Sequence, residues 1–130
     1  MTDDGLDRAR AALTAAELTE SPAERYLMAH LAALRIAAVV LAARAHASSG
    51  TRLRNAWQLV AEIAPEFSEW AAYFGATQAK REAVAAGAVT LVSHREADDL
   101  LRDAQAFHGA VARKLARARR AATRADRGAG

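Results

Sequence analysis

The longest apolar run of the chain spans residues 22–47 and predicts a helix at the centre of the fold. Ser21, Pro22 and Glu24 form a helix start, because serine can cap free amides, proline fits the first helical position and glutamate can close a capping box. Helical spacing gives two apolar faces, one of Leu27, Leu31, Leu34, Ala38 and Leu41 and the other of Met28, Ala32, Ile36 and Val39. A helix that is apolar on two sides normally lies inside a domain.

Weaker helical patterns occur on both sides of this run. Residues 6–18 predict a peripheral helix with the apolar face Leu6, Ala9, Leu13 and Ala16. After residues 48–50, which read as a loop, Thr51 can cap another helix. Pro65 ends that helix and begins a fourth over residues 65–86, and Gly87 is a suitable C-cap.

The last pattern is the most regular one. Ser93 and Glu96 form a second capping box, and the helix that they open carries an apolar stripe of Ala97, Leu100, Ala104, Phe107, Val111 and Leu115. With only two prolines and no strand-like alternation in the chain, these patterns predict an all-α fold. Alanine accounts for 37 of the 130 residues, so the helices should approach one another closely around a few large side chains.

The charge of the chain is unevenly distributed. Residues 113–130 hold seven basic residues and one acid, a net charge of +6, whereas residues 1–112 hold eleven basic and fourteen acidic residues, a net charge of −3. We therefore expect a helical body over residues 1–112, followed by a basic helix extension or disordered tail over residues 113–130. The tail can bind nucleic-acid phosphates, or it can simply be a solvated helix end. The residues that would bind phosphates are Arg113, Lys114, Arg117, Arg119, Arg120 and Arg124.

Composition excludes several kinds of chemistry. The chain has no cysteine, which rules out disulfides, thiolate nucleophiles and cysteine-based zinc sites. The four histidines form no tight ligand pair, so we expect neither a metal site nor a cofactor. The run 22–47 is short for a membrane span and is interrupted by Arg35 and Arg44, so we expect a cytoplasmic protein without a membrane partner.

Two pairs of arginine and histidine are candidates for chemistry on phosphates. Arg25 and His30 are five residues apart, and Arg102 and His108 are six residues apart with Asp103 after the arginine. Along a helix, the members of each pair point about 120–140° away from each other. Without other information, a surface arginine and a partly buried histidine explain each pair.

Three segments together resemble an actinobacterial family of HEPN-domain proteins, of the higher-eukaryote and prokaryote nucleotide-binding superfamily. They are PAERYLMAHLAALRIAAVVLAARA (22–45), AWQLVAEIAPEFSEWAAYF (56–74) and READDLLRDAQAF (95–107). The resemblance covers roughly residues 6–112 and implies a bundle of four to five helices that forms a homodimer. In active members, an arginine followed after four to six residues by a histidine meets its counterpart at the dimer cleft.

For this chain, the resemblance implies a metal-independent endoribonuclease. The histidine would move the proton of the RNA 2′-hydroxyl, and the arginine would stabilise charge on the phosphate. Both Arg25 with His30 and Arg102 with Asp103 and His108 have the required spacing. Tyr26 follows Arg25 where a polar residue is usual, whereas Asp103 fits that pattern. Many HEPN domains are not catalytic, so the alternative is a helical module that binds nucleic acid or a protein partner.

Overall fold

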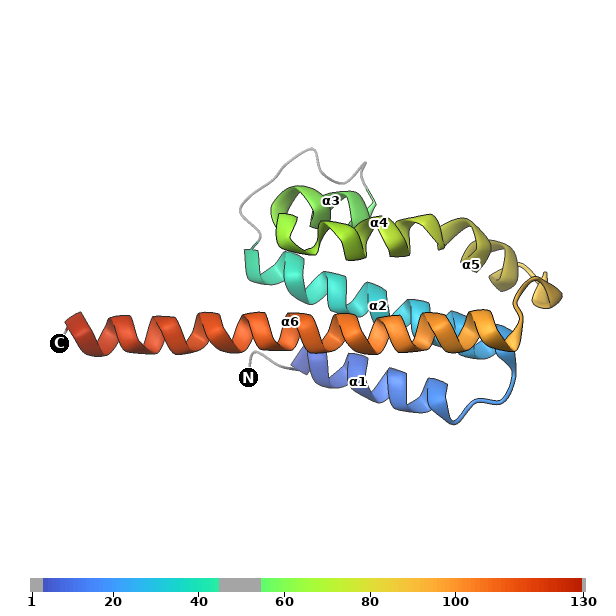
Figure 1. Ribbon diagram of the computed structural model, residues 1–130, viewed down its shortest axis with the longest axis horizontal. Coiled ribbons are helices and arrows are strands. Elements are labelled where there is room, and N and C mark those ends of the chain that lie inside the picture. The colour runs from blue at the N-terminus through green and yellow to red at the C-terminus, as the bar shows by residue number, and fades with distance from the viewer. Residues whose placement is uncertain (1–3, 45–54, 130) are drawn as a thin grey trace.

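The computed structural model describes residues 4–44 and 55–129, and within these ranges the secondary structure consists of helices joined by short turns. The α-helices are α1 (Asp4–Glu17), α2 (Pro22–Arg44), α3 (Ala56–Ile63), α4 (Ser68–Ala76), α5 (Gln78–Ala85) and α6 (His94–Ala129). Short 3-10 turns, η2 (Pro65–Phe67) and η3 (Val89–Leu91), precede α4 and follow α5. Figure 1 shows α1 on one side of α2 and α6 and the α3–α5 segment on the other. The predicted all-α bundle is confirmed.

Helix α2 is the centre of the bundle and contacts α1, α3, α5 and α6. Of its two predicted apolar faces, the one with Met28, Ala32, Ile36 and Val39 is the more deeply buried, and the leucine face packs only partly against the core. Alanines occupy much of the buried surface, and Leu31 keeps 40% of its surface exposed. The buried residues of α2 are Ala23, Tyr26, Ala29, His30, Ala32, Ala33, Ile36, Ala37 and Val40. Small side chains let several helices approach α2 at once, which displaces the leucines to its margins.

The length of α2 also corrects the expectation that this apolar run is too short to span a membrane. At 23 residues, Pro22–Arg44 is long and apolar enough to cross a membrane by length and composition alone. A central helix of a helical bundle passes the same test, and 44% of its most apolar window is buried against the other helices. The absence of a membrane partner therefore stays a prediction that rests on this packing.

An aromatic cluster fills the space between α6 and the α3–α4 segment. The ring of Phe107 on α6 lies 5.4 Å from Phe74, 5.6 Å from Trp70, 6.0 Å from Phe67 and 6.2 Å from Trp57, measured between ring centroids. These distances are typical of favourable aromatic pairs. The few large side chains of this alanine-rich protein are thus concentrated in one part of the core.

The single helix predicted over residues 65–86 is divided in the structure. A 3-10 turn begins at Pro65, and α4 and α5 are separated at Thr77. The hydroxyl of Thr77 donates to the carbonyl of Phe74 at 2.8 Å, and the amide of Thr77 donates to the same oxygen at 3.2 Å. These i to i−3 bonds replace the regular α-helical pattern and close the helix locally.

The predicted helix boundaries agree best where side chains act locally. Ser93 and Glu96 exchange their capping bonds, both at 3.1 Å, and Ser21 accepts from the amide of Glu24 at 3.3 Å. Gly87 follows α5 with a φ of 116°, a conformation that suits glycine. Thr51 lies outside the described residues, and α3 begins at Ala56 with Asn55 and Gln58 as its capping box.

Helix α6 is much longer than its partners. Val111 is its last fully buried residue, and the helix continues to Ala129 beyond the body of the bundle. Figure 1 shows this segment, which we call the α6 extension (residues 113–129), projecting away from the other helices. The cations of the basic segment are therefore presented on a helix.

Candidate functional site

Arg25 joins the end of α1 to α6. Its Nε donates to the carbonyl of Ala16 at 3.1 Å, and its Nη2 donates to the carbonyls of Glu17 and Thr19 at 3.1 and 2.7 Å. Its Nη1 forms an ion pair with Asp98 of α6. The last carbonyls of a helix lack partners within the helix, and a cation there also complements the helix dipole. The contacts of Arg25 thus give it a clear structural role.

His30 lies on another side of α2, inside the core. Its side chain is completely buried, and its Nε2 is 3.3 Å from the carbonyl of Phe74. Since a carbonyl can only accept, Nε2 carries the proton in this hydrogen bond. The rings of Trp57 and Phe74 lie 6.2 and 6.4 Å away, edge-on to the imidazole. His30 and Arg25 therefore contact different elements and share no open space in this chain.

The buried imidazole predicts that acid destabilises the fold. Burial lowers the pKa of His30, and nearby Arg81 acts in the same direction, whereas the Phe74 hydrogen bond and Glu82 oppose it. From about pH 7.5 to about pH 5.5, the unfolded chain takes up a proton at His30 that the folded chain resists, so the free energy of unfolding should fall by about 1 kcal/mol. Urea unfolding at the two pH values measures this loss.

A His30→Gln variant serves as the reference for that measurement. Glutamine keeps a donor for the Phe74 carbonyl but does not titrate, so the variant should lose most of the pH dependence in this interval. Equal pH dependence in the two proteins would show that other groups cause it. The carboxylates Glu66 and Glu96, whose pKa values are lowered by Arg44 and Lys80 respectively, titrate at more acidic pH.

The second motif is also divided between two sides of a helix. Arg102 is exposed on α6 and lies 3.2 Å from Asp99 and 3.7 Å from Asp103, measured between nitrogen and carboxylate oxygen. Asp103 is directed towards α4, where its carboxylate forms a hydrogen bond with Tyr73. Burial is the main reason that the pKa of Tyr73 is raised, and this hydrogen bond raises it further. Arg102 and Asp103 thus form a local charged cluster with Asp99.

His108 faces α1 instead. Its Nε2 lies 2.9 Å from the carbonyl of Leu6, and the side chain is mostly buried. The imidazole lines a surface hollow of about 290 Å³ that Arg10 of α1 also lines. The remaining lining residues are Leu13, Thr14, Glu17, Gln105 and Gly109. In this chain, the cation that shares a hollow with His108 is therefore Arg10, which the motif spacing did not suggest, and not Arg102.

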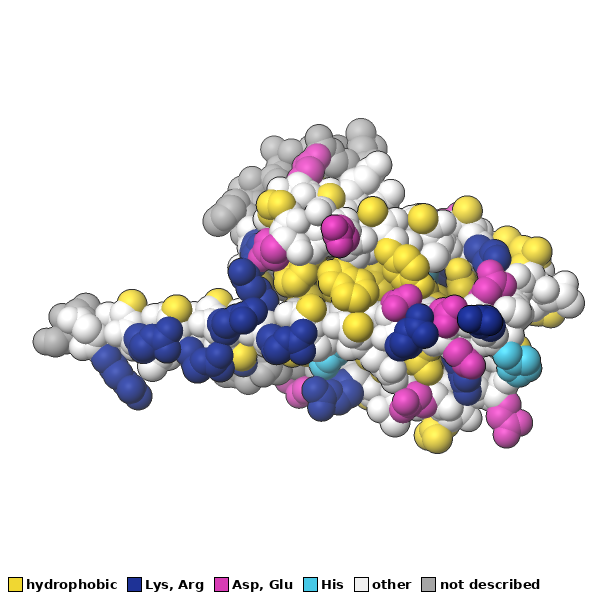
Figure 2. All heavy atoms as spheres, viewed as in Figure 1, with side chains coloured by type: hydrophobic (Ala, Val, Ile, Leu, Met, Phe, Trp, Pro, Cys, Tyr) yellow, Lys and Arg dark blue, Asp and Glu magenta, His cyan; other side chains and the backbone are white. Residues whose placement is uncertain are grey.

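The α6 extension carries a continuous row of cations. Arg113, Arg117, Arg120, Arg124 and Arg127 are all exposed and are spaced alternately by four and three residues. At 100° per residue they fall within an arc of about 80°, and they extend over roughly 21 Å of helix. Figure 2 shows Lys and Arg side chains following one another along this segment. We call these five residues the arginine row.

Two of the six predicted cations lie outside this row. Lys114 is 3.7 Å from Glu66, which also pairs with Arg44, so Lys114 connects the base of the extension to the body. Arg119 lies towards α2 and lines a groove there. Arg127 was not among the predicted cations, although its spacing of three residues from Arg124 would have identified it.

Comparison with protein families agrees with this architecture. A family model described as SAV_6107-like HEPN matches residues 15–112. The chain belongs to this HEPN family. The match ends one residue before the arginine row begins, so the row is a feature of this HEPN protein outside the matched domain. No curated protein and no solved structure shows significant similarity to the chain. Its actinobacterial origin, and catalysis by either Arg–His motif, stay predictions.

Proposed function

We propose that this HEPN protein binds RNA through the arginine row, and that it does so in the cytoplasm. The row supports the proposal because five exposed guanidinium groups on one helical face can contact successive phosphates. The body has the opposite net charge, −3 over residues 1–112, so electrostatic attraction is concentrated on the extension. The extension contains no aromatic side chain, so it supplies affinity and little selectivity among bases.

Binding of a labelled single-stranded RNA over a range of salt concentrations tests the proposal. If all five arginines contact phosphates, the logarithm of the association constant should fall against the logarithm of salt concentration with a slope of about −3.5. Fluorescence anisotropy gives this slope directly. A slope near zero, or no binding at low salt, would contradict phosphate recognition by the row.

A ribonuclease is the second candidate, and the hollow beside His108 favours it. Arg10 and His108 line one space from two helices, so a phosphate there could meet both a cation and a proton-transferring group. A homodimer could add Arg102 from a second copy. His30 is completely enclosed and has no such access. The products would be a 2′,3′-cyclic phosphate and a 5′-hydroxyl.

Incubation of a structured RNA with the protein in EDTA separates the two candidates. The nuclease hypothesis expects cleavage that His108→Ala and Arg10→Gln each reduce by about 10²-fold or more. The exposed His94, at the start of α6, provides the control, and His94→Ala should cleave normally. Equal cleavage by all proteins would indicate a contaminant, and intact RNA would leave binding as the function.

A further inference from the structure

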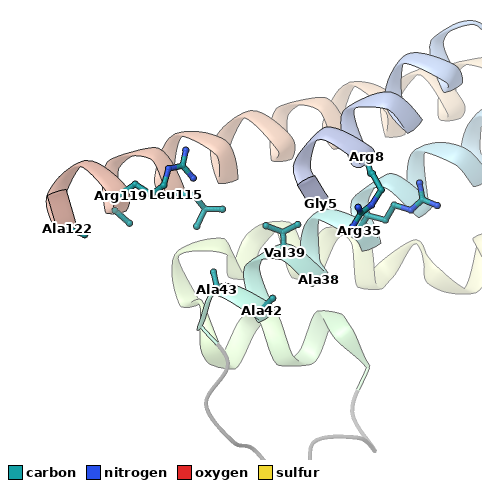
Figure 3. A pocket seen from close by; sticks show the side chains of 11 residues that line it. Gly5, Arg8, Arg35, Ala38, Val39, Ala42, Ala43, Leu115, Arg119 and Ala122 are labelled. Carbon is teal, nitrogen blue, oxygen red and sulfur yellow. The ribbon is translucent and has the colours of Figure 1, made fainter. Parts of the chain in front are cut away.

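The inner side of the α6 extension borders a groove that the arginine row does not use. The groove has a volume of about 750 Å³ and lies between the extension, the C-terminal half of α2 and the start of α1 (Figure 3). Its apolar lining consists of Gly5, Ala38, Val39, Ala42, Ala43, Leu115, Ala118 and Ala122. Most of these side chains are small, which leaves room for large side chains from an occupant.

A second row of inward-facing residues on α6 continues into this groove. Leu101, Ala104, His108 and Val111 follow a spacing of three and four residues and are buried in the bundle. The same spacing continues through Leu115, Ala118, Ala122 and Ala125, where Leu115 is partly exposed and the alanines are exposed. A sustained repeat of this kind is typical of a helix that packs along its whole length against other helices. Beyond Val111, the described part of the chain flanks these residues with α2 and the start of α1, and it leaves the alanines exposed.

Positive charges surround this apolar surface. Arg8 of α1 and Arg35 of α2 lie at one end of the groove, and Arg119 lies on the α6 wall (Figure 3). Within residues 4–44 and 55–129, neither Arg8 nor Arg35 forms an ion pair. The occupant that complements this rim is therefore negatively charged as well as apolar.

We propose that the groove binds an acidic amphipathic helix of a partner protein. Large apolar side chains at every third or fourth position would fill the alanine-lined space, and flanking carboxylates would meet Arg8 and Arg35. A second copy of the extension fits poorly, because its net charge of +6 would face these arginines. The interaction goes beyond RNA binding, since the groove and the arginine row lie on opposite sides of the same helix.

A labelled helical peptide of about 18 residues, with leucines on one face and glutamates beside them, is the probe. It should bind the full chain and shift the methyl resonances of Val39 and Leu115, which line the groove. Arg35→Glu should weaken binding at least about tenfold, because it reverses a charge on the rim. Ala42→Trp should abolish binding by filling the groove from an exposed position of α2.

Two controls distinguish the groove from general attraction between opposite charges. Arg124→Glu changes the same charge on the opposite face of the extension, and it should leave peptide affinity within about twofold. The same peptide with lysine at each glutamate should not bind. Absent binding, or equal weakening by Arg35→Glu and Arg124→Glu, would overturn the proposal. So would a dimer that Ala42→Trp dissociates, or RNA binding that Ala42→Trp abolishes, because a second copy or RNA would then be the occupant.

Discussion

Replacement of Phe107 by alanine is expected to lower the free energy of unfolding by about 3–5 kcal/mol. The ring is completely buried and lies within 6.2 Å of Trp57, Phe67, Trp70 and Phe74. Its removal leaves a cavity that four rigid rings from the α3–α4 segment cannot readily fill. Since domains of this size have only about 5–15 kcal/mol of stability, the variant should unfold at much lower urea concentrations.

Leu18→Ala is the control for this measurement. Leu18 is 79% exposed at the end of α1, so its truncation should change the free energy of unfolding by less than about 0.5 kcal/mol. Both values come from urea unfolding followed by circular dichroism. Similar losses in the two variants would show that the aromatic cluster does not hold α6 against α3 and α4.

Sequence reasoning succeeded where neighbouring residues determine the structure. The buried face of α1, made of Leu6, Ala9, Leu13 and Ala16, follows directly from helical spacing. The capping box of Ser93 and Glu96 was also identifiable, because its two hydrogen bonds connect residues three positions apart. In both cases the deciding interactions lie within one or a few turns of the chain.

Predictions that depend on packing between distant segments were less accurate. Helical spacing gave α2 two apolar faces, but it could not show how deeply each position of the helix is buried. The structure buries Ala29 and Ala33 as well as the predicted Ala32, because α1, α3, α5 and α6 all approach this helix. The break at Thr77 was missed for a related reason. Threonine is common within helices, and its local bonds to Phe74 become evident only in the folded chain.

At the candidate site too, local features were predicted and contacts between distant segments were not. Spacing identified Arg25 and His30 as a pair, but it could not reveal that Arg25 contacts the end of α1 while His30 faces Phe74. Spacing likewise could not predict that Arg10 and His108 line the same hollow, because these residues come from different helices. The arginine row, in contrast, is a property of one helix, and its alternation of three and four residues is visible in the sequence.

Substitution of Arg117, Arg120 and Arg124 by glutamine is expected to weaken RNA binding about a hundredfold at 0.1 M salt. The three residues lie on the exposed face of the α6 extension, beyond the last fully buried residue, Val111. Their loss should remove about two units from the slope of the logarithm of affinity against that of salt concentration. The melting temperature should stay nearly constant, because the three side chains are exposed.

A matched triple variant separates the row from net charge. Arg8, Arg35 and Arg95 are also exposed arginines, and replacing them by glutamine changes the net charge by the same three units. Because they lie on the body and not on the row, this variant should retain RNA affinity within about threefold and keep the salt slope of the original protein. If both triple variants bind equally weakly, attraction to the whole protein would account for RNA binding. If only the row variant loses affinity, RNA contacts the outer face of the extension, and the groove on its inner face stays free for a protein partner.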